Sequence, residues 1–283
     1  MNARKVHVAR ALGLALLASG LAACGGGDRV RESQQFVDEP VALLYNRGAE
    51  LLDERRWAEA LVAFEEVERQ HPYSSWARRA MLMEAYAHYQ ANDYDASIEN
   101  AQRFLALHPG NESAPYAYYL ISICHFERIL DVGRDQATTE RALGALLDVT
   151  RRYPESPYAR DARLKIDMVY DQLAGKEMEI GRFYLTGGQH LAAINRFREV
   201  IENENFQTST HAPEALHRLV EAYLSVGMVD EAQRMAAILG HNYPGSDWYT
   251  RSYELMTGQG VIVVDEAEAE RRGWFARAWD RVF

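Results

Sequence analysis

The segment Tyr153-Pro154-Glu155-Ser156-Pro157-Tyr158-Ala159 belongs to a set of four similar segments that divide this chain into repeats. The others are His71-Pro72-Tyr73-Ser74-Ser75-Trp76-Ala77, His108-Pro109-Gly110-Asn111 and Tyr243-Pro244-Gly245-Ser246-Asp247-Trp248. Proline cannot continue a helix, and it keeps the residue before it extended. Ser or Asn two residues later is a preferred N-cap for the next helix. The four segments therefore predict helices joined by short turns.

Small residues recur at a fixed distance before each of these prolines. Twelve residues upstream stand, in order, Ala60, Ser97, Ala142 and Ala232. A fifth unit, with Gly181, Ala193 and Phe197, has Asn205 where the proline would stand. Small residues at this spacing are typical of tetratricopeptide repeats (TPR), because they let two helix backbones approach to about 8–10 Å. The predicted fold is an all-α tetratricopeptide-repeat superhelical solenoid of about five helix pairs.

The repeat pattern also predicts where the helices lie. We expect helices at 40–53 and 57–70, 75–91 and 94–107, 113–130 and 139–152, 157–187 and 190–204, 212–226 and 229–242, and a short one at 246–257. The long helix at 157–187 could instead break at Gly175, since an internal Gly costs about 1 kcal/mol relative to Ala. The predicted solenoid spans residues 40–257.

The N-terminus has the features of an export signal. Three positive side chains precede the apolar run 11–23, which is too short to span a membrane and suits a signal peptide. The run ends in Leu21-Ala22-Ala23-Cys24, which resembles the bacterial lipobox. We expect residues 1–23 to be removed, Cys24 to carry a covalent lipid, and 24–39 to form a flexible tether. An ordinary secretory signal followed by a chance Cys is the alternative.

Composition and motifs argue against several function classes. The chain has 283 residues and a formal net charge of -10, which is a poor match for nucleic acid. It contains no Gly-rich phosphate loop, no G-x-S-x-G and no His-Glu-x-x-His. His71 and His108 are expected to end helices, while His211 and His217 make no convincing ligand set. We find no nucleophile–base constellation, so we expect no enzyme, no metal site and no cofactor beyond the lipid on Cys24. With Cys24 acylated, Cys124 has no disulfide partner and should be buried.

The lipobox, the tether and the five repeats together resemble the BamD family, the lipoproteins of the outer-membrane β-barrel assembly (BAM) machinery. The resemblance covers the mature chain to about residue 257. It is carried by Trp57-x-x-Ala60, Tyr73-x-x-Trp76-Ala77, Ala85-Tyr86-x-x-Tyr89 and, most specifically, Tyr184-x-x-x-Gly188-x-x-x-Ala192-x-x-Asn195-Arg196.

The resemblance implies a non-catalytic BAM subunit that is lipid-anchored on the periplasmic face of the outer membrane. Its implied partners are the POTRA region of BamA, other BAM lipoproteins and unfolded outer-membrane β-barrel proteins. Asn195 and Arg196 match the family's BamA-binding pair, and Tyr73 and Trp76 match aromatics implicated in binding substrate peptides. The alternative is another periplasmic TPR lipoprotein scaffold, such as a cell-wall enzyme regulator or a pilotin.

Residues 258–283 extend beyond the shorter members of that family. Four aromatic residues alternate with arginines between 271 and 283, which predicts a C-terminal amphipathic tail with a basic face. The tail could be disordered or loosely docked, or it could form a helix that contacts the membrane surface or a partner.

Overall fold

A computed structural model describes residues 39–129 and 136–260. Within these two ranges the chain forms 11 helices and no strand. They are α2 (Val41–Asp53), α3 (Trp57–Gln70), α4 (Ser75–Gln90), α5 (Tyr94–Leu107), α6 (Ala114–Phe126), α7 (Ala137–Arg152), α8 (Pro157–Thr186), α9 (His190–Glu202), α10 (Ala212–Ser225), α11 (Val229–Asn242) and α12 (Asp247–Gly258). The predicted signal peptide, the acylated Cys24, the tether up to residue 38 and the tail from residue 261 lie outside the described residues.

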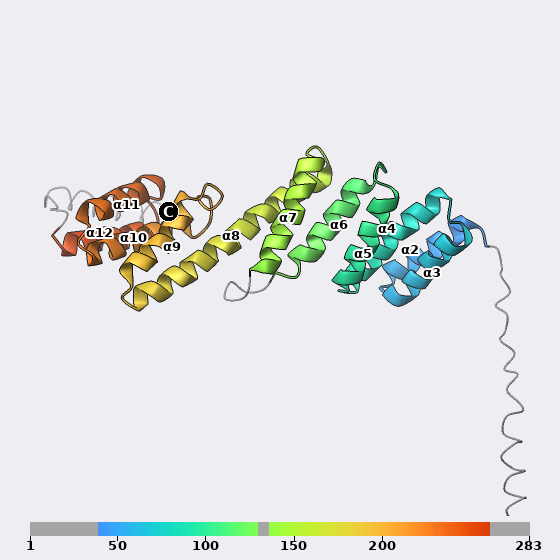
Figure 1. Cartoon of the computed structure of the whole chain (residues 1–283), viewed down its shortest axis with the longest axis horizontal. Helices are drawn as coiled ribbons and strands as arrows, with labels where there is room; N and C mark the ends of the chain where they lie inside the picture. Colours follow the sequence, from blue (N-terminus) through green and yellow to red (C-terminus); the bar gives the residue numbers. More distant parts are fainter. Residues whose placement is uncertain (1–38, 130–135, 261–283) are drawn as a thin grey trace, which may run out of the picture.

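The helices pack in consecutive antiparallel pairs, as the all-α TPR prediction requires. Figure 1 shows them side by side along one long axis, from α2 and α3 at one end to α10, α11 and α12 at the other. Each helix packs on the next one in the chain, and α2, α4 and α6 also contact each other in turn. The molecule is therefore an elongated solenoid in which each pair covers the apolar face of its neighbour.

Serine caps begin three of the helices that follow the Pro-containing turns. The Oγ atoms of Ser74, Ser156 and Ser246 accept hydrogen bonds from backbone N–H groups three residues later, at 3.0 to 3.1 Å. The cap expected at Asn111 is wrong. Its Oδ1 accepts instead from the N–H of Ser113, two residues on, which forms a side-chain turn, and α6 begins only at Ala114.

Close helix contacts explain the small residues of the repeat. Gly48 of α2 faces the ring of Phe64 on α3, and Gly181 of α8 faces the ring of Phe197 on α9. A Cβ atom would lie 2.6 Å from the Phe64 ring at the first glycine and 2.4 Å from the Phe197 ring at the second. The same relation thus occurs in two of the pairs, where glycine on the first helix lets a phenylalanine from the second helix fill the core.

Helix α8 connects the two halves of the solenoid. It is unbroken for 30 residues, about 45 Å at 1.5 Å per residue, so the alternative break at Gly175 is wrong. Its N-terminal part packs with α6 and α7, and its C-terminal part packs with α9 and with the buried side chains of α10. Tyr170 and Leu173 belong to both of these apolar clusters. In the preceding pair, α6 ends at Phe126 rather than at the expected 130, and α7 begins at Ala137 rather than 139.

A buried carboxyl group helps to connect the first two helix pairs, through contacts among α3, α4 and α5. Arg103 of α5 donates to Glu68 of α3 at 3.0 Å and to Glu84 of α4 at 3.1 Å. Glu84 is only 4% exposed. Burial raises the pKa of Glu84 to about 9, and the nearby Glu68 carboxylate adds to that rise. Glu84 therefore holds a proton at neutral pH in the folded protein.

Candidate functional site

Asn195 and Arg196 lie on α9 and line a groove of about 530 Å³. The groove is formed by residues of α7, α8 and α9 and by the loop after α9, namely Gln136, Glu140, Leu173, Lys176, Glu177, Tyr184, Ala192, Asn195, Arg196, Glu199 and Phe206. Because α7 belongs to one half of the solenoid and α9 to the other, an occupant of this groove would contact both halves. The two residues matched to the family's partner-binding pair thus share one concave surface.

The Arg196 guanidinium is half-exposed and points into this groove. Its Nη1 donates to Oε2 of Glu177 on α8 at 3.0 Å, and the two side chains are 44% and 20% exposed. Asn195 beside it is exposed. Arg196 stands at the border of the buried face of α9, since Ala193 and Phe197 on either side of it are fully buried. The sequence gives no sign of an intramolecular acceptor, because Glu177 lies 19 residues away.

Tyr73 and Trp76, the predicted peptide-binding pair, have different environments. Tyr73 lies in the α3–α4 turn with 96% of its surface exposed. Trp76 in the first turn of α4 packs against the first helix pair, with its ring centroid 5.0 Å from that of Tyr45. Trp76 therefore has a packing role that Tyr73 does not have. The two nearby tyrosines at 86 and 89 pack in the cores of the first and second pairs.

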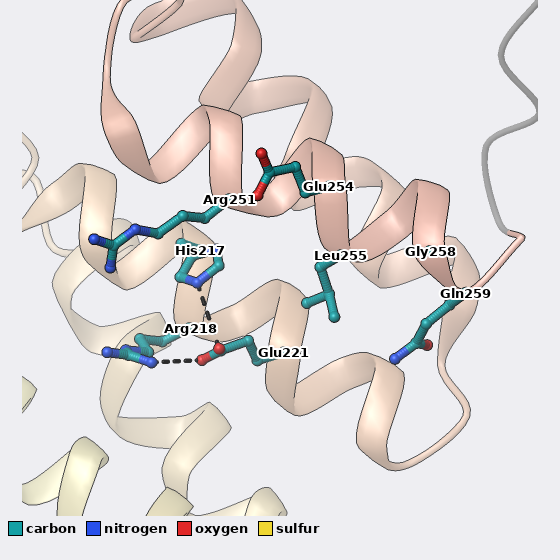
Figure 2. A pocket seen from close by; sticks show the side chains of 8 residues that line it. All are labelled: His217, Arg218, Glu221, Arg251, Glu254, Leu255, Gly258 and Gln259. Atoms are coloured by element: carbon teal, nitrogen blue, oxygen red, sulfur yellow. Dashed lines mark hydrogen bonds and ion pairs between the residues drawn. The ribbon is translucent and has the colours of Figure 1, made fainter.

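A second concave site lies between α10 and α12, and sequence reasoning missed it. Its volume is about 500 Å³, and Figure 2 shows the lining side chains His217, Arg218, Glu221, Arg251, Glu254, Leu255, Gly258 and Gln259. Trp248 stands beside it with its ring centroid 5.3 Å from that of His217. The guanidinium carbons of Arg218 and Arg251 lie 5.4 Å and 4.7 Å from the Trp248 ring. The site therefore combines an aromatic surface with cations that stack on it.

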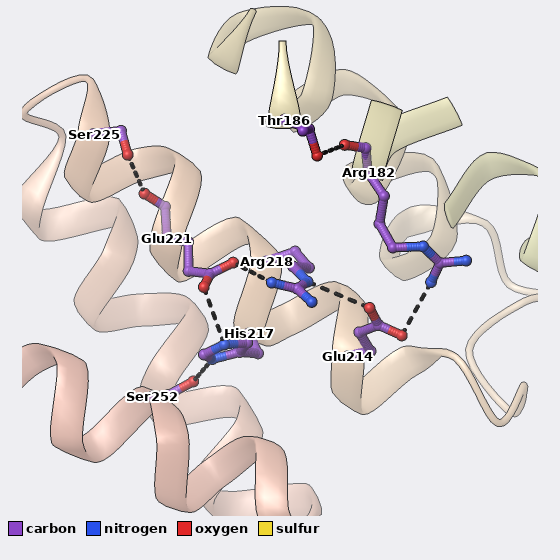
Figure 3. A network of polar contacts seen from close by, with 8 residues as sticks. All are labelled: Arg182, Thr186, Glu214, His217, Arg218, Glu221, Ser225 and Ser252. Atoms are coloured by element: carbon purple, nitrogen blue, oxygen red, sulfur yellow. Dashed lines mark hydrogen bonds and ion pairs between the residues drawn. The ribbon is translucent and has the colours of Figure 1, made fainter. Parts of the chain in front are cut away.

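A chain of polar contacts links this site to α8 (Figure 3). Glu214 accepts from Arg182 of α8 at 3.1 Å and from Arg218 at 3.3 Å, and Arg218 in turn donates to Glu221 at 2.8 Å. Burial opposes ionisation of Glu221, but hydrogen bonds from His217 and Arg218 outweigh it, so the pKa of the Glu221 carboxyl is lowered. The network holds α10 against α8 on one side and α12 on the other.

His217 brings a serine and a carboxylate together. Its Nδ1 lies 2.7 Å from Oγ of Ser252 on α12, and its Nε2 lies 3.4 Å from Oε1 of Glu221. The distances in this group resemble those of a nucleophile–base pair. However, Ser252 is fully buried and His217 is 4% exposed, so no substrate can reach the hydroxyl. The pair satisfies buried polar groups at the α10–α12 contact. The His–x–x–x–Glu spacing was visible in the sequence, but Ser252 lies 35 residues away.

The remaining predicted residues have structural positions. His71 and His108 follow the last residues of α3 and α5, as expected. Cys124 is fully buried, with its Sγ 3.2 Å from Oγ of Ser97, and burial raises the pKa of its thiol to about 11. In the two described ranges, no three His, Cys, Asp or Glu side chains are placed to share a metal ion. None of the helices from α2 to α12 is long and apolar enough to cross a membrane.

Comparisons with known proteins point to one family. A family model described as outer membrane lipoprotein (YfiO) matches residues 37–238. A Caulobacter vibrioides protein described as outer membrane protein assembly factor BamD is 56% identical over 246 residues, covering 87% of this chain and 80% of its own. A Rickettsia prowazekii protein of the same description is 43% identical over 242 residues, covering 86% of this chain and 95% of its own. Among solved structures, a TPR domain of yeast Sti1 covers 77% of this chain and 84% of its own at 10% identity, with a TM-score of 0.42.

Proposed function

The chain belongs to the BamD family of outer-membrane lipoproteins, and from this premise we propose that it is a subunit of the outer-membrane β-barrel assembly complex. In this role it acts as a scaffold without catalysis. It is anchored to the periplasmic face of the outer membrane through a lipid on Cys24. It binds BamA and other BAM lipoproteins, and it receives unfolded β-barrel proteins for folding and insertion.

The groove around Arg196 is the proposed BamA site. The single observation that carries this assignment is a half-exposed guanidinium in a concave surface formed by both halves of the solenoid. Large apolar side chains stand next to it: Leu191 is 67% exposed one turn before Asn195, and Phe183 is 73% exposed beside the groove residue Tyr184. Exposed apolar anchors next to an arginine are the usual composition of a protein–protein contact centre.

The N-terminal end of the solenoid, around the α3–α4 turn, is the proposed receiving end for substrate. Tyr73 supports this assignment, because an almost fully exposed tyrosine in a turn offers a large contact area and a hydroxyl at little conformational cost. The proposed BamA site is on α8 and α9, so the two sites lie in different halves that α8 connects. A substrate and BamA can then be held at the same time.

Binding to BamA tests the proposal. We expect Arg196→Ala to weaken the complex with the POTRA region at least tenfold, about 1.4 kcal/mol, because an arginine paired at an interface contributes more than an exposed one. Arg198→Ala is the matched control, since Arg198 lies on the same helix, is exposed and pairs within the helix with Glu202. Equal effects of the two substitutions, measured by calorimetry on the purified proteins, would remove Arg196 from the binding site.

Depletion of the protein tests the assignment to the assembly complex. Loss of an assembly subunit should lower the levels of many outer-membrane β-barrel proteins together, measured by quantitative proteomics of isolated outer membranes. A defect confined to pili or to cell division would instead favour another periplasmic scaffold.

A further inference from the structure

Arg196 is held at only one of its nitrogens. Oε2 of Glu177 accepts a hydrogen bond from Nη1 at 3.0 Å. Within residues 39–129 and 136–260, this oxygen is the one acceptor that the Arg196 guanidinium contacts. A guanidinium carries five N–H donors in a planar fork. The edge formed by Nη2 and Nε therefore keeps its donors for another acceptor, in the geometry that a carboxylate binds with two parallel hydrogen bonds.

Glu177 stands on a well-packed stretch of α8. Its neighbours on α8, Ala174, Gly175 and Met178, are buried, and its own side chain is 20% exposed. Arg196 has a long side chain with several rotatable bonds and is 44% exposed. A fixed acceptor on a packed helix thus restricts a flexible donor on the next helix before any partner arrives.

The rim of the groove is acidic once this pair is formed. Glu140 from α7 and Glu199 from α9 add two carboxylates. Glu199 accepts a hydrogen bond from the neutral Asn203 amide, and in the described part of the chain Glu140 has no cationic partner. Lys176 is the one further cation of the lining, and its Nζ lies 3.8 Å from Glu179. An acidic stretch would meet repulsion here, whereas a single carboxylate beside a basic side chain would not.

We infer that Glu177 is a positioning residue, which holds Arg196 so that its Nη2–Nε edge receives one carboxylate of the partner, and that the acidic rim selects a partner segment with a basic side chain next to that carboxylate. This inference rests on the proposed function of the groove. Prior ordering of Arg196 removes part of the entropy cost of binding, which corresponds to about threefold to tenfold in affinity for one long side chain.

Two substitutions of Glu177 distinguish a residue that positions Arg196 from one that competes with the partner for Arg196. In Glu177→Gln the amide oxygen still accepts from Nη1, so we expect the affinity for detergent-solubilised full-length BamA to stay within about twofold or to tighten. In Glu177→Ala the acceptor is lost, and we expect a loss of about threefold to tenfold. If Glu177 instead competed with the partner for Arg196, both substitutions would tighten binding, and that result overturns the inference.

The Arg196→Ala background excludes a merely structural effect. There, Glu177→Ala should cause no further loss, because the group it positions is absent. A loss that persists in this background means that Glu177 supports the fold rather than Arg196, and it overturns the inference. Glu202→Ala is the matched control, since it removes the carboxylate partner of Arg198 outside the groove, and it should leave BamA affinity unchanged.

The free protein provides a readout that does not depend on BamA. Nitrogen NMR of the Arg196 side chain in the full-length mature chain should show slowed guanidinium rotation in the wild type and in Glu177→Gln, and fast rotation in Glu177→Ala. Equal rotation in all three overturns the inference. If the wild type shows the slow rotation but does not bind BamA, the proposed function fails while the positioning of Arg196 stands.

The proposed contact between the acidic rim and a basic side chain of the partner is tested separately. Replacing Glu140 and Glu199 together by Gln should weaken BamA binding severalfold, because the partner's basic side chain loses both carboxylates. Unchanged affinity would remove the basic side chain from the description of the partner segment.

Discussion

Replacing Gly181 by Ala should destabilise this protein, although Ala is the better helix former. The new Cβ would lie 2.4 Å from Cε1 of Phe197, and that ring is fully buried in the core of α8, α9 and α10, so it has no room to move aside. Overpacking of this kind costs about 1–3 kcal/mol, whereas Gly to Ala inside a helix contributes about 0.5–1 kcal/mol of stability. We expect the free energy of unfolding to fall by up to about 2.5 kcal/mol.

Gly144→Ala is the control for helix propensity. Gly144 lies inside α7, is exposed, and has open space where a Cβ would stand. This variant should gain about 0.5–1 kcal/mol, so the two alanine variants should differ by about 1–3 kcal/mol. Urea unfolding of the mature chain, followed by far-UV circular dichroism, measures that difference.

The contact with the phenylalanine ring can be tested separately. Gly48→Ala should behave like Gly181→Ala, because its Cβ would lie 2.6 Å from Cε1 of Phe64. Replacing Phe197 by Leu in the Gly181→Ala background should recover part of the loss, since Leu is smaller. If Gly181→Ala were as stable as Gly144→Ala, the glycine would not be required by close helix approach, and the explanation of the repeat's small residues would be refuted.

Three further predictions concern the anchor, the turn aromatics and the buried carboxyl. Cys24→Ser should move the protein from the membrane to the soluble periplasmic fraction; retention in isolated outer membranes would indicate another anchor. Tyr73→Ala should weaken binding of a peptide from the C-terminus of a β-barrel protein without changing the melting temperature, whereas Trp76→Ala should cost roughly 1–3 kcal/mol, because its half-buried ring packs on Tyr45; equal melting temperatures would contradict this distinction. The folded protein keeps a proton on Glu84 at pH values where the unfolded chain has lost it, so the free energy of unfolding should fall as the pH rises from about 4.5 towards about 9, and Glu84→Gln should remove that slope in urea titrations at several pH values.

Local signals in the sequence are enough to locate the helices. A proline stops a helix and a serine two residues later starts the next, and both effects operate within one turn of backbone, as the caps at Ser74 and Ser156 demonstrate. The small residues mark helix pairing for a similar reason, because two backbones cannot approach closely around a large side chain. Asn111 can either cap a helix or form a side-chain turn, and here it forms the turn. Helix α6 therefore begins at Ala114, three residues after Asn111.

The partners of polar and aromatic side chains were decided only by the packing of distant helices. Tyr73 and Trp76 are three residues apart and look alike in sequence, yet one is exposed and the other contacts a ring on α2. The acceptor of Arg196 lies 19 residues away on α8. Sequence determined the solenoid because helix starts, stops and pairings depend on neighbours within a few residues. Which carboxylate meets Arg196, and how much of that guanidinium remains for a partner, depends on how α8 and α9 lie against each other, so only the tertiary structure decided it.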